Sequence, residues 1–88
     1  MGRIKNWEYE GFYTSTKARV WRNMRTGRSV RVRPVPCIGY NIHERGGICY
    51  WRVELLRRSG RIERLYEVDT LKDAMKKARA WMRRHPNG

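Results

Sequence analysis

The sequence is poor in cysteine, proline, phenylalanine and acidic residues, and it lacks any long apolar run. Of its 88 residues, two are Cys, three are Pro, one is Phe and eight are Asp or Glu. No apolar stretch approaches the roughly 18 residues that a membrane-spanning helix needs. The opening segment MGRIKNWEYEG also lacks the apolar centre of a secretion signal. We therefore expect a cytoplasmic protein with no membrane partner.

The two cysteines, Cys37 and Cys49, are too few for a disulfide framework. His43 lies midway between them, and His85 is the only other histidine. Structural zinc sites usually have four ligands, with some of them only a few residues apart. We therefore expect no metal ion and no other cofactor. Two ordinary buried thiols are the favoured interpretation, and a single Cys37–Cys49 disulfide is the alternative.

The familiar catalytic motifs are missing from the sequence. It contains no Ser-His-Asp arrangement, no phosphate-binding P-loop and no HExxH zinc motif. We expect most acidic residues to cap the helix or to pair with arginines across strands, the second role falling to Glu54, Glu63 and Glu67. The pair His43–Glu44, in a glycine-rich loop, is the candidate for acid–base chemistry. We predict that the protein is not an enzyme and has no small-molecule substrate, with a small basic nuclease as an alternative.

Positive charge is the strongest signal in the composition. Lys and Arg number 21 against eight acidic residues, which gives a formal net charge of +13. Such an excess repels itself in a folded protein and is typical of proteins with a polyanionic partner. Most of the basic residues are arginines, whose forked, weakly hydrated guanidinium groups bind phosphate oxygens in pairs. The composition therefore predicts nucleic acid as the partner.

The chain is short enough for one domain, residues 1–88, in three segments. Residues 1–17 are irregular and rich in aromatic residues, which we expect to pack under the sheet, and this segment can form one short strand. Residues 18–68 read as an antiparallel sheet, with the strands ARVWRN, RSVRVRPV, ICYWRVELL and IERLYEV and with turns at Gly27 and Ser59–Gly60. Residues 70–85 read as a helix.

The helix has a start signal, a stop signal and one apolar side. Asp69 or Thr70 can cap it, with Asp73 in its first turn, and Pro86 ends it. Its apolar residues recur at helical spacing and form one stripe that can dock on a sheet. The remaining side carries lysines and arginines, which either contact flanking phosphates or stay solvated. The predicted fold is α+β: an antiparallel sheet of three to four strands packed on one C-terminal α-helix.

The stretch RSVRVRPVP alternates strictly between apolar and basic residues, which indicates a strand with one buried face. If the helix covers one face of the sheet, the residues expected toward it are Ala18, Val20, Val30, Val32, Cys49, Trp51, Val53, Leu55, Tyr66 and Val68, with Ile62 on the same parity as Tyr66. The residues expected on the opposite face are Arg19, Trp21, Arg31, Arg33, Tyr50 and Arg52. Guanidinium forks match phosphate and the edge of guanine, and exposed aromatic rings stack on bases.

Residues 50–82, YWRVELLRRSGRIERLYEVDTLKDAMKKARAWM, resemble the hairpin and helix of AP2-type and integrase arm-type DNA-binding domains. The matching features are Trp51, the Ser59–Gly60 turn, Val68-Asp69-Thr70, and the alanines of the helix. The resemblance implies a sheet that lies in the major groove of DNA, with contacts from Tyr50, Arg52, Arg61 and Arg64. The segments MGRIKNW and WRNMRTG are similar to short uncharacterised archaeal proteins, which implies an archaeal cytoplasmic setting.

We therefore predict a small basic nucleic-acid-binding protein that prefers double-stranded DNA and is associated with the nucleoid. Its predicted contact residues are Arg19, Trp21, Arg31, Arg33, Tyr50, Arg52, Arg61 and Arg64. An RNA-binding or ribosome-associated protein is the main alternative, because the same surface could stack unpaired bases. A protein that binds a protein partner through exposed aromatic residues is a third interpretation. Sequence specificity and oligomeric state stay open.

Overall fold

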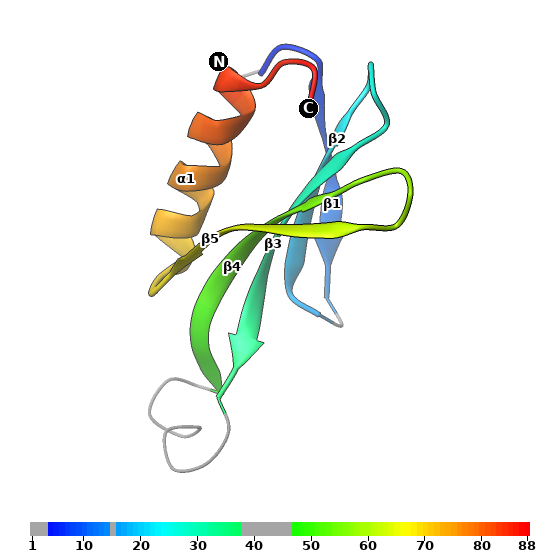
Figure 1. Ribbon diagram of the computed structural model, residues 1–88. Coiled ribbons are helices and arrows are strands. Elements are labelled where there is room, and N and C mark those ends of the chain that lie inside the picture. The colour runs from blue at the N-terminus through cyan, green and yellow to red at the C-terminus, as the bar shows by residue number, and fades with distance from the viewer. Residues whose placement is uncertain (1–3, 15, 38–46) are drawn as a thin grey trace.

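Five antiparallel strands follow one another in chain order to form one sheet, and a single helix lies across one of its faces (Figure 1). The computed structural model describes residues 4–14, 16–37 and 47–88. The elements are β1 (Trp7–Tyr13), β2 (Ala18–Asn23), β3 (Ser29–Pro36), β4 (Ile48–Leu56), β5 (Ile62–Val68) and α1 (Leu71–Arg84). The α+β prediction is confirmed, but the expected three to four strands are five.

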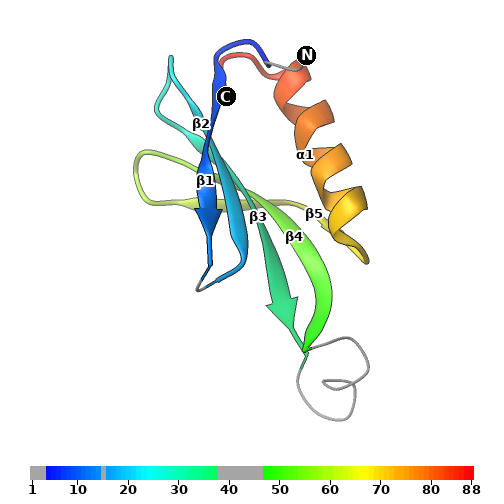
Figure 2. The ribbon, with the colours of Figure 1, turned by 180° about the vertical axis from the view of Figure 1, so that it is seen from behind.

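The additional strand is β1, which forms one edge of the sheet and pairs with β2 (Figure 2). Its sequence does not alternate, and its register shifts between Tyr9 and Gly11, so that an extra residue bulges out. The expectation that the N-terminal aromatics pack under the sheet holds for Trp7, which is buried. It is wrong for Tyr9, Phe12 and Tyr13, which are about half exposed.

The expected face of β2 is also wrong. Trp21 pairs with Val30, and Arg19 pairs with Val32. Because residues directly opposite each other in a ladder point to the same face, Trp21 and Arg19 lie on the helix side of the sheet, with the valines of β3. Ala18 and Val20 therefore lie on the opposite side. The turn between β2 and β3 sets this pairing, and a change of one residue in register exchanges the two faces of a strand.

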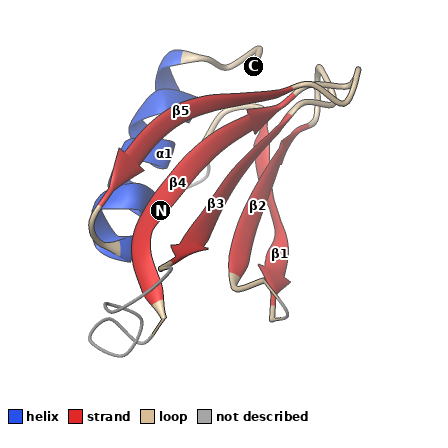
Figure 3. Ribbon diagram, turned by 60° about the horizontal axis from the view of Figure 1, so that its bottom comes forward, coloured by secondary structure: helices blue, strands red, loops and turns tan. Residues whose placement is uncertain are grey.

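The core lies between α1 and the second half of the sheet. Val30, Val32, Val53 and Leu55 face the helix and are almost completely buried. The helix places Ala74, Ala78 and Met82 against them, and the small alanines let the helix approach the sheet closely. Figure 3 shows α1 beside β4 and β5, with β1 and β2 extending away from it. The predicted apolar stripe is therefore confirmed as the packing side of the helix.

Both ends of the helix have the predicted signals. Thr70 is the N-cap, and its side-chain oxygen accepts a hydrogen bond of 3.1 Å from the backbone N–H of Asp73. His85 is the C-cap. The predicted range 70–85 is thus the helix together with its two caps. No helix among the described residues has the length and the apolar character that crossing a membrane requires.

A buried asparagine holds the segment after the helix against the sheet. Asn23 is completely buried, and its Oδ1 accepts hydrogen bonds from the backbone N–H groups of Arg25 and Thr26, both 2.9 Å long. Its Nδ2 donates to the carbonyl oxygen of Pro86, also at 2.9 Å. The indole N–H of Trp7 donates to the carbonyl of His85. Both ends of the described chain therefore lie side by side at the C-terminal end of α1 (Figures 1 and 2).

Two further expectations about the second half of the sheet are corrected. Cys37 and Cys49 form a disulfide, so the favoured interpretation as two free thiols is wrong. In β5, Tyr66 pairs with Val53 whereas Arg64 pairs with the next residue, Glu54. One residue of β5 therefore bulges out between them, and Ile62 no longer shares a face with Tyr66. The exposure of Ile62 follows from this shift.

Candidate nucleic-acid interface

The open face of the sheet, meaning the face turned away from α1, contains part of the predicted contact surface. Cross-strand pairing places Arg31 beside Glu54, and Arg33 beside Arg52. Tyr50 lies on the same face, opposite Val35. Arg64 pairs with Glu54 from β5 and lies on this face too. The structure therefore brings together five of the predicted residues, but it places a buried carboxylate among them.

Glu54 is the centre of an ion cluster with two arginines. Glu54 is only 4 % exposed, and its carboxylate accepts hydrogen bonds from Arg31 at 2.7 and 2.9 Å. Arg33 donates to the same carboxylate at 3.0 and 3.3 Å. Burial acts to raise the pKa of Glu54, but the hydrogen bonds from Arg33 and Arg31 outweigh it and lower the pKa below its ordinary value. Both guanidinium groups thus hold a carboxylate of the protein itself.

Arg52 is engaged in a second cluster on the open face. Its Nε donates to Glu67 at 2.7 Å, and its Nη2 donates to the hydroxyl of Tyr50 at 2.9 Å. Burial acts to lower the pKa of Arg52, but the hydrogen bond to Glu67 and the neighbouring Tyr50 help to raise it above its ordinary value. Arg64 lies 3.6 Å from Glu67 and is largely exposed. The prediction that Glu54, Glu63 and Glu67 pair with arginines is confirmed, with Arg57 as the partner of Glu63.

The remaining predicted contact residues lie elsewhere. Arg19 and Trp21 are on the helix side of the sheet, and Trp21 is part of the core. Arg61 is exposed, next to the turn between β4 and β5. The predicted grouping of guanidinium groups and rings on one open surface is therefore wrong for β2.

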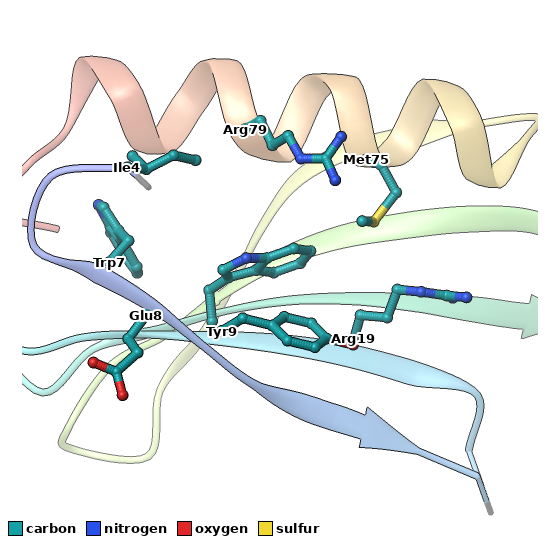
Figure 4. A pocket seen from close by; sticks show the side chains of 8 residues that line it. Ile4, Trp7, Glu8, Tyr9, Arg19, Met75 and Arg79 are labelled. Carbon is teal, nitrogen blue, oxygen red and sulfur yellow. The ribbon is translucent and has the colours of Figure 1, made fainter. Parts of the chain in front are cut away.

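The helix covers only part of its side of the sheet and leaves a groove over β1 and β2. Strands are spaced by about 4.8 Å, so five strands are roughly twice as wide as the ~10 Å diameter of a helix. Because α1 packs on β3, β4 and β5, the helix-side surface of β1 and β2 stays partly uncovered. There a cavity of about 530 Å³ lies between helix and sheet (Figure 4). Its lining residues are Ile4, Trp7, Glu8, Tyr9, Arg19, Trp21, Met75 and Arg79.

This groove combines aromatic rings with two arginines. The rings of Tyr9 and Trp21 lie 5.1 Å apart and are tilted by 58°. The guanidinium of Arg19 lies over the ring of Phe12, 4.8 Å from its centre. Arg79 reaches from the helix over the opposite side of the groove, and the carboxylate of Glu8 is turned away from the helix (Figure 4). The groove therefore offers a ring surface with a cation on either side.

A row of exposed cations runs along α1 beside the groove. Lys72, Lys76, Arg79 and Arg83 are spaced i, i+4, i+7 and i+11, which places them on one side of a helix. We call these four residues the basic stripe. Within residues 4–14, 16–37 and 47–88, none of the four forms an ion pair with a carboxylate. Arg79 belongs to both the stripe and the groove, so the two form one continuous surface.

The other side of the helix differs from the basic stripe. Lys77 lies over the ring of Tyr66 in β5, 5.4 Å from its centre. Arg84 follows Lys77 by seven residues and so lies on the same side, as does Asp73. Sequence reasoning treated all the basic residues of the helix alike. The four-residue spacing would have separated the stripe, but the groove depends on β1 and the register of β2, which the sequence pattern did not indicate.

The candidate catalytic pair, His43 and Glu44, lies outside the described residues. Among the residues that are described, no group of three or more His, Cys, Asp and Glu side chains is placed to hold a metal ion. The structure therefore adds no support to the nuclease alternative, and the candidate site consists of the basic stripe and the groove.

Comparison with protein-family models, curated proteins and solved structures finds no match for this chain. The resemblance of residues 50–82 to AP2-type and integrase arm-type domains therefore stays a prediction.

Proposed function

We propose that this protein binds nucleic acid through the basic stripe of α1 and the adjoining groove. The observation that carries the proposal is the contrast between two sets of basic residues. Arg31, Arg33 and Arg52 on the open face hold glutamates of the protein, whereas the four stripe residues are exposed and have no carboxylate partner in the described ranges. Cations of the second kind are available to neutralise phosphates and to release their counterions.

The dimensions of the stripe suit a row of phosphates. Eleven residues separate Lys72 from Arg83, which corresponds to about 17 Å along a helix. Arg79 and Arg83 can bind phosphate oxygens in a bidentate manner, and the two lysines act as point charges. A net charge of +13 adds long-range attraction for any polyanion.

The proposal differs from the sequence prediction in where the nucleic acid lies. A duplex on the open face would have to compete with Glu54 and Glu67 for Arg31, Arg33 and Arg52. It would also meet the carboxylates themselves, which repel phosphate. The stripe has neither disadvantage. RNA and single-stranded DNA become the favoured ligands because the surface beside the stripe is an aromatic groove rather than a flat sheet.

The experiment compares two double charge reversals that change the net charge equally. Lys72→Glu with Lys76→Glu alters the stripe, and Lys77→Glu with Arg84→Glu alters the other side of α1. Binding of a fluorescent single strand is measured by anisotropy between 50 and 200 mM salt. Four phosphate contacts predict a log–log salt slope of about −2.8, which is roughly a fiftyfold loss of affinity over that range. The stripe variant should have a slope near −1.4, and the other variant should keep the native slope.

Two results would contradict the proposal. If the native protein binds neither single strands nor duplexes at 50 mM salt, nucleic acid is not its ligand. If the two double variants lose affinity and slope equally, binding follows from net charge alone and the stripe is not the contact surface. Circular dichroism of each variant confirms that the fold is retained.

A further inference from the structure

Building on the proposed function, we propose that the groove between α1 and strands β1 and β2 receives one unpaired base of a single-stranded nucleic acid. The base stacks on Tyr9, and its phosphates lie between Arg19 and Arg79. The ligand class that this inference assigns to the protein is single-stranded rather than duplex nucleic acid. The inserted base also gives a role to a cavity that the basic stripe alone does not explain.

Tyr9 has the properties of a stacking platform. The residue is 50 % exposed, although its side chain lies on the helix side of the sheet and lines the cavity. The contact with Trp21, 5.1 Å between ring centres, supports one side of the ring and leaves the rest of it open. Trp21 is itself buried in the core, so the support is rigid. A ring held in this way loses little conformational freedom when a base stacks on it.

The arginines give the groove its preference for an anionic ligand. Arg19 reaches the groove from β2 and Arg79 reaches it from the helix, so the two cations belong to opposite walls (Figure 4). The ring of Phe12 holds the guanidinium of Arg19 at 4.8 Å without neutralising it. An apolar peptide would leave these charges unused, whereas a nucleotide matches both the rings and the charges.

The shape of the site selects an unpaired base. The cavity of about 530 Å³ is within the range of small-molecule sites, and its rings lie between a helix and a sheet. A base within a duplex has both faces stacked on neighbours, so it cannot enter such a groove without first leaving the helix. The adjoining basic stripe can then bind the phosphates on one side of the inserted base.

Tyr13 provides a matched control for Tyr9. Both are tyrosines of β1 with nearly equal exposure, 50 % and 48 %, but pairing with Ala18 places Tyr13 on the open face. The probes are oligothymidylate and oligouridylate of about ten nucleotides, together with a duplex of the same length. Tyr9→Ala should weaken binding of both single strands roughly tenfold to a hundredfold. Tyr13→Ala should stay within about twofold of the native protein, and duplex affinity should not change. Tyr9→Phe keeps the ring and should recover most of the affinity that Tyr9→Ala loses.

If Tyr9→Ala is poorly folded, another pair of variants and a spectroscopic measurement test whether a base enters the groove. Arg79→Ala should weaken single-strand binding more than Arg83→Ala, because both arginines belong to the basic stripe but only Arg79 lines the groove. Tryptophan fluorescence should be quenched by the single strands and not by the duplex. Equal affinities of the Tyr9→Ala and Tyr13→Ala variants for single strands would overturn the inference. In that case salt-dependent binding that depends on the stripe would leave the proposed function standing, whereas no binding of any probe would remove both.

Discussion

Replacing Arg31 and Arg33 together by methionine will leave a buried carboxylate without either of its cations. Glu54 is 4 % exposed and receives all four of its arginine hydrogen bonds from these two residues. Loss of the partners of a buried ion costs about 3–5 kcal/mol of unfolding free energy. For a domain of this size, that loss lowers the melting temperature by roughly 12–40 °C. A single Arg31→Met change leaves the hydrogen bonds from Arg33 and should cost about 1.5–3 kcal/mol.

The pH dependence of the same variants gives an independent measurement. In the native protein the pKa of Glu54 is lowered, so its ionised form contributes stability that is present above about pH 4.3 and is lost as the pH falls through the lower folded value. In the double variant burial acts alone and raises the pKa of Glu54. The cost of burying the ionised Glu54 carboxylate is therefore present at neutral pH, and it disappears when acid protonates the carboxylate. The difference in melting temperature between the two proteins should narrow as the pH falls from 7 to 4.

Two controls separate the buried carboxylate from a general effect of lost charge. Arg64→Met removes an arginine that is 63 % exposed and lies 3.6 Å from its glutamate, so it should cost less than about 1 kcal/mol. Adding Glu54→Leu to the double variant removes the stranded charge and should restore most of the stability. Thermal melts followed by circular dichroism at pH 7 measure the stability of each variant against the native protein. A double variant that melts within a few degrees of the native protein would refute the reasoning.

Two further substitutions test other parts of the fold. Asn23→Ala removes three hydrogen bonds at a completely buried site and should lower the unfolding free energy by about 3 kcal/mol. Urea denaturation measures this loss. A loss below about 1 kcal/mol would show that water replaces the amide. Cys37→Ser opens a loop whose ends are 12 residues apart and should cost about 3 kcal/mol. The native protein measured with reductant should lose the same amount, and a melting temperature that does not respond to reductant would contradict this account.

The parts of the fold that the sequence predicted are those with a strong local period. The alternation of valine and arginine over residues 30–33 fixed both the strand and its buried face, because a valine displaced to the open side would lose its burial. The helix was predicted together with its Thr70 cap, since capping depends on a few adjacent residues. Such features are decided within about ten residues of chain.

The errors arose where contacts between residues far apart in the sequence determine the structure. In β2 both parities contain apolar residues, so the pattern ARVWRN does not state which face is buried, and the pairing of Trp21 with Val30 decides it. The strand β1 has no alternation because it lies at an edge and contains a bulge. The groove depends on both of these features. It could therefore not be predicted, although its residues Tyr9, Arg19 and Trp21 were all noticed as aromatic or basic.

The location of the available positive charge follows from where the few acidic residues lie. Glu10, Glu54, Glu63 and Glu67 lie on strands, and each forms an ion pair with an arginine of the sheet or of a hairpin. The helix has six basic residues but only one acidic residue, Asp73, which lies in its first turn and away from the basic stripe. The sheet therefore uses its arginines to compensate its own carboxylates. Six basic residues against one acidic residue leave α1 with a net charge of +5, so the basic stripe attracts a phosphate chain directly beside the groove.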